Sequence, residues 1–340
     1  IIDSSAVMVN PNSNTADSLF LKKYYVSINQ KVFMKKIVIV FFVVFIAAVM
    51  TSTAQTAESY FAAGLEKAEK GLYKEALADF TKVIELNPKS AVASYTNRGN
   101  AKNVLGDNYG AITDCNKAIE LNPQLAEAYT NRGLAKFSLG DKYSAIDDFT
   151  KVIELNPQSA DVYAVRGIVK SELGDTKGAI ADYTKAIELN PQLADVYTHR
   201  GVAKFSLGDN YAAIADYTKA IELNPQFAEA YTNRGYAKNN LGDKEGAIAD
   251  YTKAIELNPQ DASSYLNRGY AKSRLGDTKG AIFDFTKAIE FNPQFAEAYY
   301  NRAIVYGQEG KETLACADLQ KASELGHKEA EVMIEENCKK

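Results

Sequence analysis

Residues Ala228 to Gln260 read AEAYTNRGYAKNNLGDKEGAIADYTKAIELNPQ. Apolar and small residues between 247 and 257 recur with a period near 3.6, which predicts a helix with one buried face. Gly242 and Asp243 predict a turn before that helix, because glycine tolerates left-handed backbone and aspartate caps helix starts. Pro259 predicts its end, because the proline ring forbids helical continuation. The stretch is therefore predicted to be a helical hairpin, with a first helix over about 229–241 and a second ending at 257.

The same unit recurs along the chain, and the dipeptide Asn-Pro marks each copy. The intervals between these marks are 35 residues once and 34 residues thereafter, with the asparagines at Asn87, Asn122, Asn156, Asn190, Asn224, Asn258 and Asn292. Aligned on them, residues 57–329 form eight consecutive copies of the unit. Self-similarity at such a period is typical of stacked repeats that share a continuous core. We therefore expect an all-α solenoid of eight helical hairpins.

This unit resembles the tetratricopeptide repeat, a 34-residue helix-turn-helix with an aromatic, a Gly, an Ala, an aromatic and a Pro at fixed offsets. In the sixth copy the matching residues are Tyr231, Gly235, Ala247, Tyr251 and Pro259. The resemblance implies a right-handed superhelix whose first helices line a concave wall, where the family binds extended peptides or helices. Residues 328–340 are expected to form a capping helix that covers the last apolar face, since a solenoid needs one. Its apolar side is predicted to carry Val332, Met333 and Ile334.

An arginine departs from the family pattern in seven copies, where the family usually has a packed Leu: Arg98, Arg132, Arg166, Arg200, Arg234, Arg268 and Arg302. A partly buried charge needs a partner, because leaving it unpaired is costly. Each second helix supplies one candidate: Asp79, Asp114, Asp148, Asp182, Asp216, Asp250, Asp284 and Asp318. The first copy has Ala63 at the arginine position and no preceding aspartate. We therefore predict that each aspartate pairs with the arginine of the next repeat, Asp79 with Arg98 through Asp284 with Arg302. Pairing within a repeat and a solvated face are the alternatives.

A row of carboxamides precedes these arginines on the implied concave wall: Asn97, Asn131, Asn233, Asn267 and Asn301, interrupted by Val165 and His199. A carboxamide both donates and accepts hydrogen bonds, so such a row can hold a peptide backbone of any sequence. The row resembles the asparagine ladder of protein-modifying N-acetylglucosaminyltransferases. The alternative is that the asparagine recurs simply because the unit recurs.

Aromatic residues vary from copy to copy on the same wall: Phe137, Phe205, Tyr236 and Tyr270. Exposed aromatics of this kind are typical anchors in interfaces. Packing between neighbouring first helices is the alternative, and we favour it for Phe205. The family members that bind chaperone tails clamp a terminal carboxylate with lysines, whereas the matching positions here hold Thr96, Thr130 and Thr232.

Catalytic and metal-binding patterns are missing from the sequence. It contains only two histidines, His199 and His327, and no phosphate-binding loop or closely spaced ligand set. We therefore expect neither an enzyme nor a metal or cofactor. Cys316 and Cys338 stand at nearly equal distances from a turn near Gly326, as an antiparallel crossing of two helices requires, and are predicted to form a disulfide.

The N-terminal region predicts export. Met34 is followed by two lysines, an apolar run over 37–50 and small polar residues, the pattern of a signal peptide over 34–54. Its alternative is a membrane anchor over 37–56, although the run is short for a span. Residues 1–33 precede this signal and are polar, and we expect them to be a disordered upstream segment, if they belong to the natural protein at all.

The composition favours protein partners. The chain of 340 residues has a net charge of −4 with both signs interspersed, whereas a nucleic-acid binder needs a basic stripe. The sequence therefore predicts an exported scaffold, periplasmic or secreted, that binds peptides or proteins in its groove. The alternatives are a structural spacer in a membrane complex and the substrate-binding partner of a separate enzyme.

Overall fold

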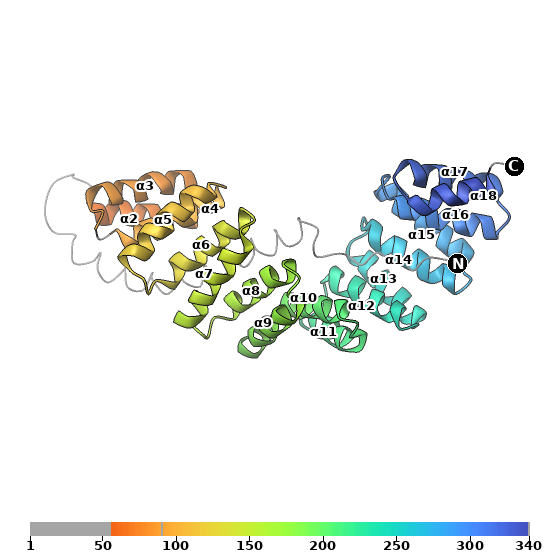
Figure 1. Cartoon of the computed structure of the whole chain (residues 1–340), viewed down its shortest axis with the longest axis horizontal. Coiled ribbons are helices and arrows are strands. Elements are labelled where there is room, and N and C mark those ends of the chain that lie inside the picture. Colours follow the sequence, from red (N-terminus) through yellow and green to blue (C-terminus); the bar gives the residue numbers. More distant parts are fainter. Residues whose placement is uncertain (1–55, 90, 339–340) are drawn as a thin grey trace. The chain divides into compact units, whose positions relative to one another are not determined.

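The computed structural model describes residues 56–89 and 91–338, and this part of the chain consists of helices joined by short turns (Figure 1). The predicted signal peptide over 34–54 and the upstream segment over 1–33 lie outside the described residues, as does nearly all of the alternative anchor. None of the helices in the described part is long and apolar enough to cross a membrane.

Sixteen of the described helices form eight consecutive hairpins. The first helices are α2 (Ala57–Glu69), α4 (Val92–Val104), α6 (Ala126–Ser138), α8 (Ala160–Glu172), α10 (Ala194–Ser206), α12 (Ala228–Asn240), α14 (Ala262–Arg274) and α16 (Ala296–Gln308). The second helices are α3 (Tyr73–Leu86), α5 (Asn108–Leu121), α7 (Lys142–Leu155), α9 (Thr176–Leu189), α11 (Asn210–Leu223), α13 (Lys244–Leu257), α15 (Thr278–Phe291) and α17 (Glu312–Glu324). A last helix, α18, spans Lys328–Asn337. The all-α hairpin architecture is confirmed.

The helices of each hairpin begin and end where the sequence predicts. In the sixth repeat Gly242 adopts a φ of 88°, a left-handed conformation that ends α12. The Asp243 carboxylate then accepts a hydrogen bond from the Gly246 N–H at 2.9 Å and caps α13. Asn258 ends α13 with an extended φ of −134°, directly before the proline. Local chemistry therefore sets the length of each helix.

Close contact between the two helices of a hairpin depends on small residues. Ala247 and Tyr251 of α13 are fully buried, and a Cβ on Gly235 of α12 would lie 2.9 Å from the Tyr251 ring. Glycine at this crossing therefore lets an aromatic ring pack against helix backbone. In the second repeat Cys115 takes the place of that aromatic, and it is fully buried as a small apolar residue.

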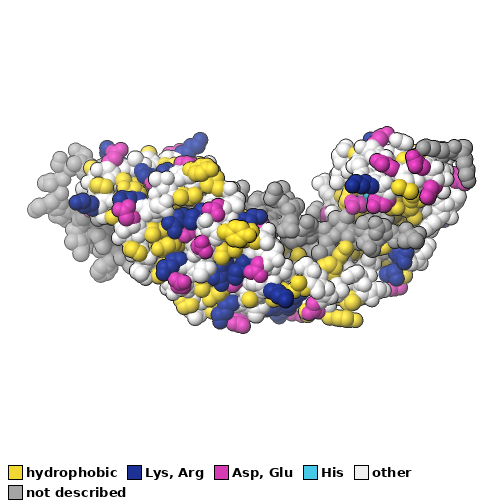
Figure 2. All heavy atoms as spheres, in the orientation of Figure 1, with side chains coloured by type: hydrophobic (Ala, Val, Ile, Leu, Met, Phe, Trp, Pro, Cys, Tyr) yellow, Lys and Arg dark blue, Asp and Glu magenta, His cyan; other side chains and the backbone are white. Residues whose placement is uncertain are grey.

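The hairpins form two compact units, which we name the N-terminal stack (α2–α9) and the C-terminal stack (α10–α18). Within each stack, the second helix of one repeat contacts the first helix of the next, as α5 contacts α6 and α13 contacts α14. First helices of successive repeats also touch, as α4 touches α6 and α12 touches α14. Both charge signs are interspersed over the face shown in Figure 2.

The arginines and aspartates pair within a repeat, so the prediction that each aspartate pairs with the arginine of the next repeat is wrong. Arg268 donates through Nε and Nη2 to the Asp284 carboxylate of its own hairpin at 2.9 and 2.7 Å. The other pairs are Arg98–Asp114, Arg132–Asp148, Arg166–Asp182, Arg200–Asp216, Arg234–Asp250 and Arg302–Asp318. The reason is geometric, because the two side chains face each other across the packed interface of one hairpin.

The third nitrogen of the guanidinium contacts the preceding repeat. Arg268 Nη1 reaches back to the Thr252 hydroxyl of the preceding repeat at 3.1 Å, and most of the other arginines reach an equivalent Thr or Asn. The first repeat has no preceding repeat to supply that oxygen. Its Asp79 pairs with Lys67 at 2.5 Å, and with no other cation among the described residues. The arginine therefore ties successive repeats together through a hydroxyl.

The C-terminal stack ends in α18, which packs through Ala330, Met333 and Ile334 against the last hairpin. Val332 is instead exposed, contrary to the prediction, because residues 332 and 334 lie about 200° apart around a helix. Cys316 of α17 is bonded to Cys338, with their Cα atoms 5.7 Å apart. This bond holds the end of α18 against the stack.

Candidate functional site

The asparagines predicted to hold a peptide are mostly buried. Asn131, Asn233, Asn267 and Asn301 have exposed fractions of 3%, 0%, 1% and 5%, and Asn97 is half-buried. Three amides bond to backbone of the protein itself, as Asn131 Nδ2 does to the Thr96 carbonyl at 3.4 Å. His199, in the same row, is half-buried. In this structure the row therefore contributes to helix packing and offers little surface to a ligand.

The aromatic positions are more accessible. Tyr236 and Tyr270 occupy equivalent places on the adjacent helices α12 and α14, and both line a hollow in the C-terminal stack. Phe205 of α10 packs edge-on against Tyr236 with ring centroids 5.3 Å apart, which is the packing role that we favoured for it. Phe137, on α6 of the N-terminal stack, is half-buried.

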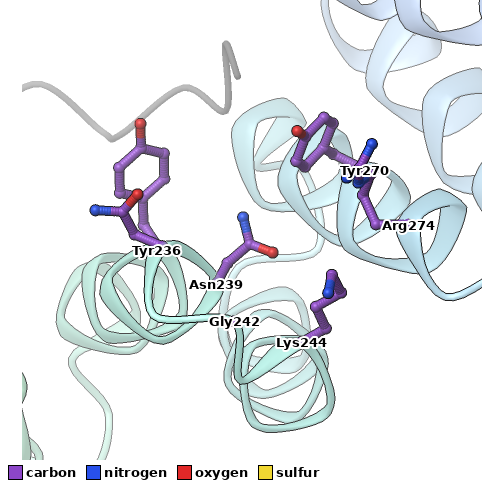
Figure 3. A pocket seen from close by; sticks show the side chains of 7 residues that line it. Tyr236, Asn239, Gly242, Lys244, Tyr270 and Arg274 are labelled. Atoms are coloured by element: carbon purple, nitrogen blue, oxygen red, sulfur yellow. The ribbon is translucent and has the colours of Figure 1, made fainter. Parts of the chain in front are cut away.

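The hollow lies between the C-terminal turns of α12 and α14 and the start of α13 (Figure 3), and it has a volume of about 270 Å³. Tyr236 and Tyr270 project to the same side, with Asn239 between them (Figure 3). The remaining lining residues are Asn240, Gly242, Lys244 and Arg274. Such a volume falls below the range of about 300–1,000 Å³ that is typical of small-molecule sites. The hollow therefore suits one or two side chains of a bound chain.

The charge of the hollow is positive. Lys244 is half-buried and Arg274 is exposed, and among the described residues neither forms an ion pair. Burial and the neighbouring Tyr270 raise the pKa of Tyr236, so its phenol stays neutral and can donate a hydrogen bond. The hollow thus offers two cations, a phenol and carboxamides to a ligand.

The variation in aromatic residues along the sequence did not indicate these cations. The signal was present in another position, the last residue of the first helix, which reads Val104, Ser138, Glu172, Ser206, Asn240, Arg274 and Gln308 from the second repeat to the eighth. Only the seventh repeat has a cation there. Recognising its importance required knowing what faces that position across the repeat junction.

Acidic side chains recur at the second position of several first helices: Glu127, Asp161, Asp195, Glu229 and Glu297. Burial raises the pKa of Glu229, and the negative charge of Asp195 adds to this effect. Asp161 and Asp195 are themselves buried. None of these five carboxylates lines the hollow.

Metal-ligating residues do not gather within residues 56–89 and 91–338, where no three His, Cys, Asp or Glu side chains share a site. Cys316 and Cys338 are bonded to each other. His327 stacks on the Tyr300 ring, with centroids 4.1 Å apart. These two cysteines and His327 are thus engaged in structural contacts.

Family models for this repeat match most of the region. Models described as "Tetratricopeptide repeat" match residues 57–90, 126–159, 228–261, 250–283 and 296–325. A model described as "TPR repeat" matches residues 99–140, 169–208, 203–242 and 273–310. No curated protein matches the chain.

Several solved structures are similar. MamA is 30% identical over 48% of this chain and 96% of its own, with a TM-score of 0.46. A tetratricopeptide repeat protein from Parabacteroides merdae is 21% identical over 72% of this chain and 96% of its own, with a TM-score of 0.56. The C-terminal part of a TPR repeat-containing protein from Cytophaga hutchinsonii is 19% identical over 71% of this chain and 98% of its own, with a TM-score of 0.60. The last two likenesses show the fold.

Proposed function

Because this chain belongs to the tetratricopeptide-repeat family, whose fold generally serves protein interaction without catalysis, we propose that it is a scaffold that binds an extended peptide segment of another protein. The site is the first-helix layer of the C-terminal stack around Tyr236 and Tyr270. The observation that carries the proposal is the hollow that these two tyrosines line.

The position of the tyrosines supports a peptide ligand. They occupy the same place in consecutive repeats, so a chain laid across α12 and α14 meets one ring and then the other. Tyrosine offers a large apolar area with few rotatable bonds and a polar tip, which explains its frequency among interface residues that dominate binding energy. Phe205 extends the aromatic surface to α10.

The test selects random dodecapeptides against the full chain and measures the affinity of a selected peptide by fluorescence anisotropy. Replacing both Tyr236 and Tyr270 with Ala is expected to weaken binding by at least about tenfold, since aromatic anchors carry most of an interface's energy. The matched control replaces Tyr143 and Tyr211, which are 74% and 76% exposed on second helices. Circular dichroism checks that both double variants are folded. Equal loss in the two variants, or no loss in the first, contradicts the proposal.

We also propose that the protein is exported, either to the periplasm or as a secreted protein. The signal-like pattern over 34–54 supports this, and so does the Cys316–Cys338 bond, because disulfides persist in oxidising compartments. Fractionation of cells that produce the full chain, with N-terminal sequencing of the product, is the test. A product beginning near residue 55 supports cleavage, an uncleaved membrane-bound product favours the anchor over 37–56, and a reduced product in the cytosol contradicts export.

A further inference from the structure

Two positions face each other across the junctions between repeats. One is the first residue of a second helix, and the other is the last residue of the first helix that follows it. In the N-terminal stack, Lys142 begins α7 and Glu172 ends α8, and Lys142 Nζ lies 2.8 Å from the Glu172 carboxylate. In the C-terminal stack, Asn210 begins α11 and Asn240 ends α12, and Asn240 Nδ2 donates to Asn210 Oδ1 at 3.2 Å. The facing pair is thus complementary at both junctions.

At the next junction this complementarity is lost. Lys244 begins α13 and Arg274 ends α14, so the residues at the two equivalent positions carry the same charge. Both line the hollow, and no carboxylate lines it with them. Like charges that line one hollow repel each other, and partial burial of Lys244 strengthens the effect. The junction therefore lacks the anion that Glu172 supplies to Lys142.

We propose that the hollow between α12, α13 and α14 is a carboxylate subsite, which takes an Asp or Glu side chain of the bound peptide between Lys244 and Arg274. This inference rests on the peptide-binding function proposed above. A planar guanidinium matches a carboxylate with two parallel hydrogen bonds, and an ammonium adds a third donor. Asn239 provides a further donor, and the two tyrosines confine the space. The protein's own Glu172, at the equivalent place beside Lys142, indicates carboxylate rather than phosphate.

The test uses the full chain in three forms: wild type, Arg274→Glu and Arg274→Gln. The Glu variant copies the Lys142–Glu172 junction, so it supplies an internal carboxylate to Lys244. We expect peptides selected by the wild type to be enriched in Asp and Glu, and those selected by the Glu variant to lack this enrichment. A selected acidic peptide should bind the Glu variant about fivefold more weakly, with the Gln variant between the two.

A double-mutant cycle separates this contact from general charge effects. The acidic residue of the selected peptide is changed to its amide, and both peptides are measured against the wild type and the Glu variant. The amide should weaken binding to the wild type by about fivefold and leave binding to the Glu variant unchanged or improved. Additive losses, or equal acidic enrichment with both proteins, overturn the proposal. A phosphoserine peptide that binds the wild type more than about tenfold tighter than the acidic one overturns the choice of carboxylate.

A second readout needs no peptide. If Lys244 and position 274 face each other, the Glu variant forms an ion pair and should unfold at a higher temperature than the Gln variant, which only removes the repulsion. A midpoint no higher than that of the Gln variant overturns the subsite, whatever the peptides do. If the midpoint rises but no peptide is selected, the proposed function fails, and the carboxylate subsite for a peptide fails with it.

Discussion

The ion network of the seventh repeat predicts that burial, rather than the distance between the charges, decides how much an ion pair contributes to the free energy of unfolding. Asp284 is fully buried and accepts hydrogen bonds from Arg268 at 2.9 and 2.7 Å, while Lys272 Nζ lies 2.8 Å away. The side chains of the two cations are only 12% and 20% exposed. Asp284→Asn keeps the shape of the side chain but leaves both cations without a counter-charge.

Removing one partner of a buried pair costs about 3–5 kcal/mol, because an uncompensated charge remains in the interior. Arg268 and Lys272 keep some contact with water. We therefore expect Asp284→Asn to lower the free energy of unfolding by about 3 kcal/mol, a large share of the roughly 5–15 kcal/mol that stabilises a domain. The control is Glu290→Gln on the same helix. Glu290 lies 2.7 Å from Lys287, but their side chains are 55% and 33% exposed, so the expected cost is about 0.5 kcal/mol or less.

Urea unfolding followed by circular dichroism is the assay, because guanidinium salts would screen the charges that are being tested. The slope of the transition is compared with that of the wild type, since repeat arrays can lose cooperativity. A loss below about 1 kcal/mol for Asp284→Asn with an unchanged slope would refute the argument, as would an equal loss for Glu290→Gln.

Three further predictions concern glycine, the disulfide and pH. Gly201→Ala should lower the free energy of unfolding by about 1–3 kcal/mol, measured in urea, because its Cβ would lie 2.6 Å from a buried tyrosine ring. Gly307→Ala meets nothing within 4 Å, so it should leave this free energy unchanged or raise it by up to about 1 kcal/mol. Reducing the Cys316–Cys338 bond, which spans 22 residues, should cost up to about 3 kcal/mol and lower the hydrogen-exchange protection of α18. The raised pKa of Glu229 means that the folded state binds a proton more readily than the unfolded chain, whose value is 4.5, so stability should rise as the pH falls from 7 toward about 5. Glu229→Gln should remove that rise. Parallel profiles of unfolding free energy against pH for the wild type and the variant would contradict this prediction.

Features governed by neighbours in the sequence were predicted closely. The sixth hairpin was expected over about 229–241 and up to 257, and its helices span Ala228–Asn240 and Lys244–Leu257. Turn glycines, capping aspartates and terminating prolines act within a few residues, so their effect can be read without knowing the tertiary structure. Repetition strengthened the prediction, because each copy of the unit carries the same signals.

Features that depend on neighbouring helices were predicted less well. The sequence indicated that Arg268 needs a carboxylate, but the spacing did not show whether the aspartate of its own repeat or of the preceding one lies closer. The asparagines recur at one position of the first helix, which the resemblance placed on the concave wall. Whether Asn233 is exposed there depends on the helices packed against it, and it is buried. Sequence periodicity places a residue on a face of its helix and does not state how deeply the next repeat covers it.

The hairpin, its 34-residue period and the helix ends could be predicted from sequence, because they follow from local backbone preferences and a repeated apolar pattern. The charge pairs, the burial of the asparagines and the hollow lined by both Lys244 and Arg274 became known only from the packing of the hairpins. Those outcomes depend on the rotation and offset of one hairpin against the next, through which residues about 30 positions apart come within hydrogen-bonding distance, as Asn210 and Asn240 do.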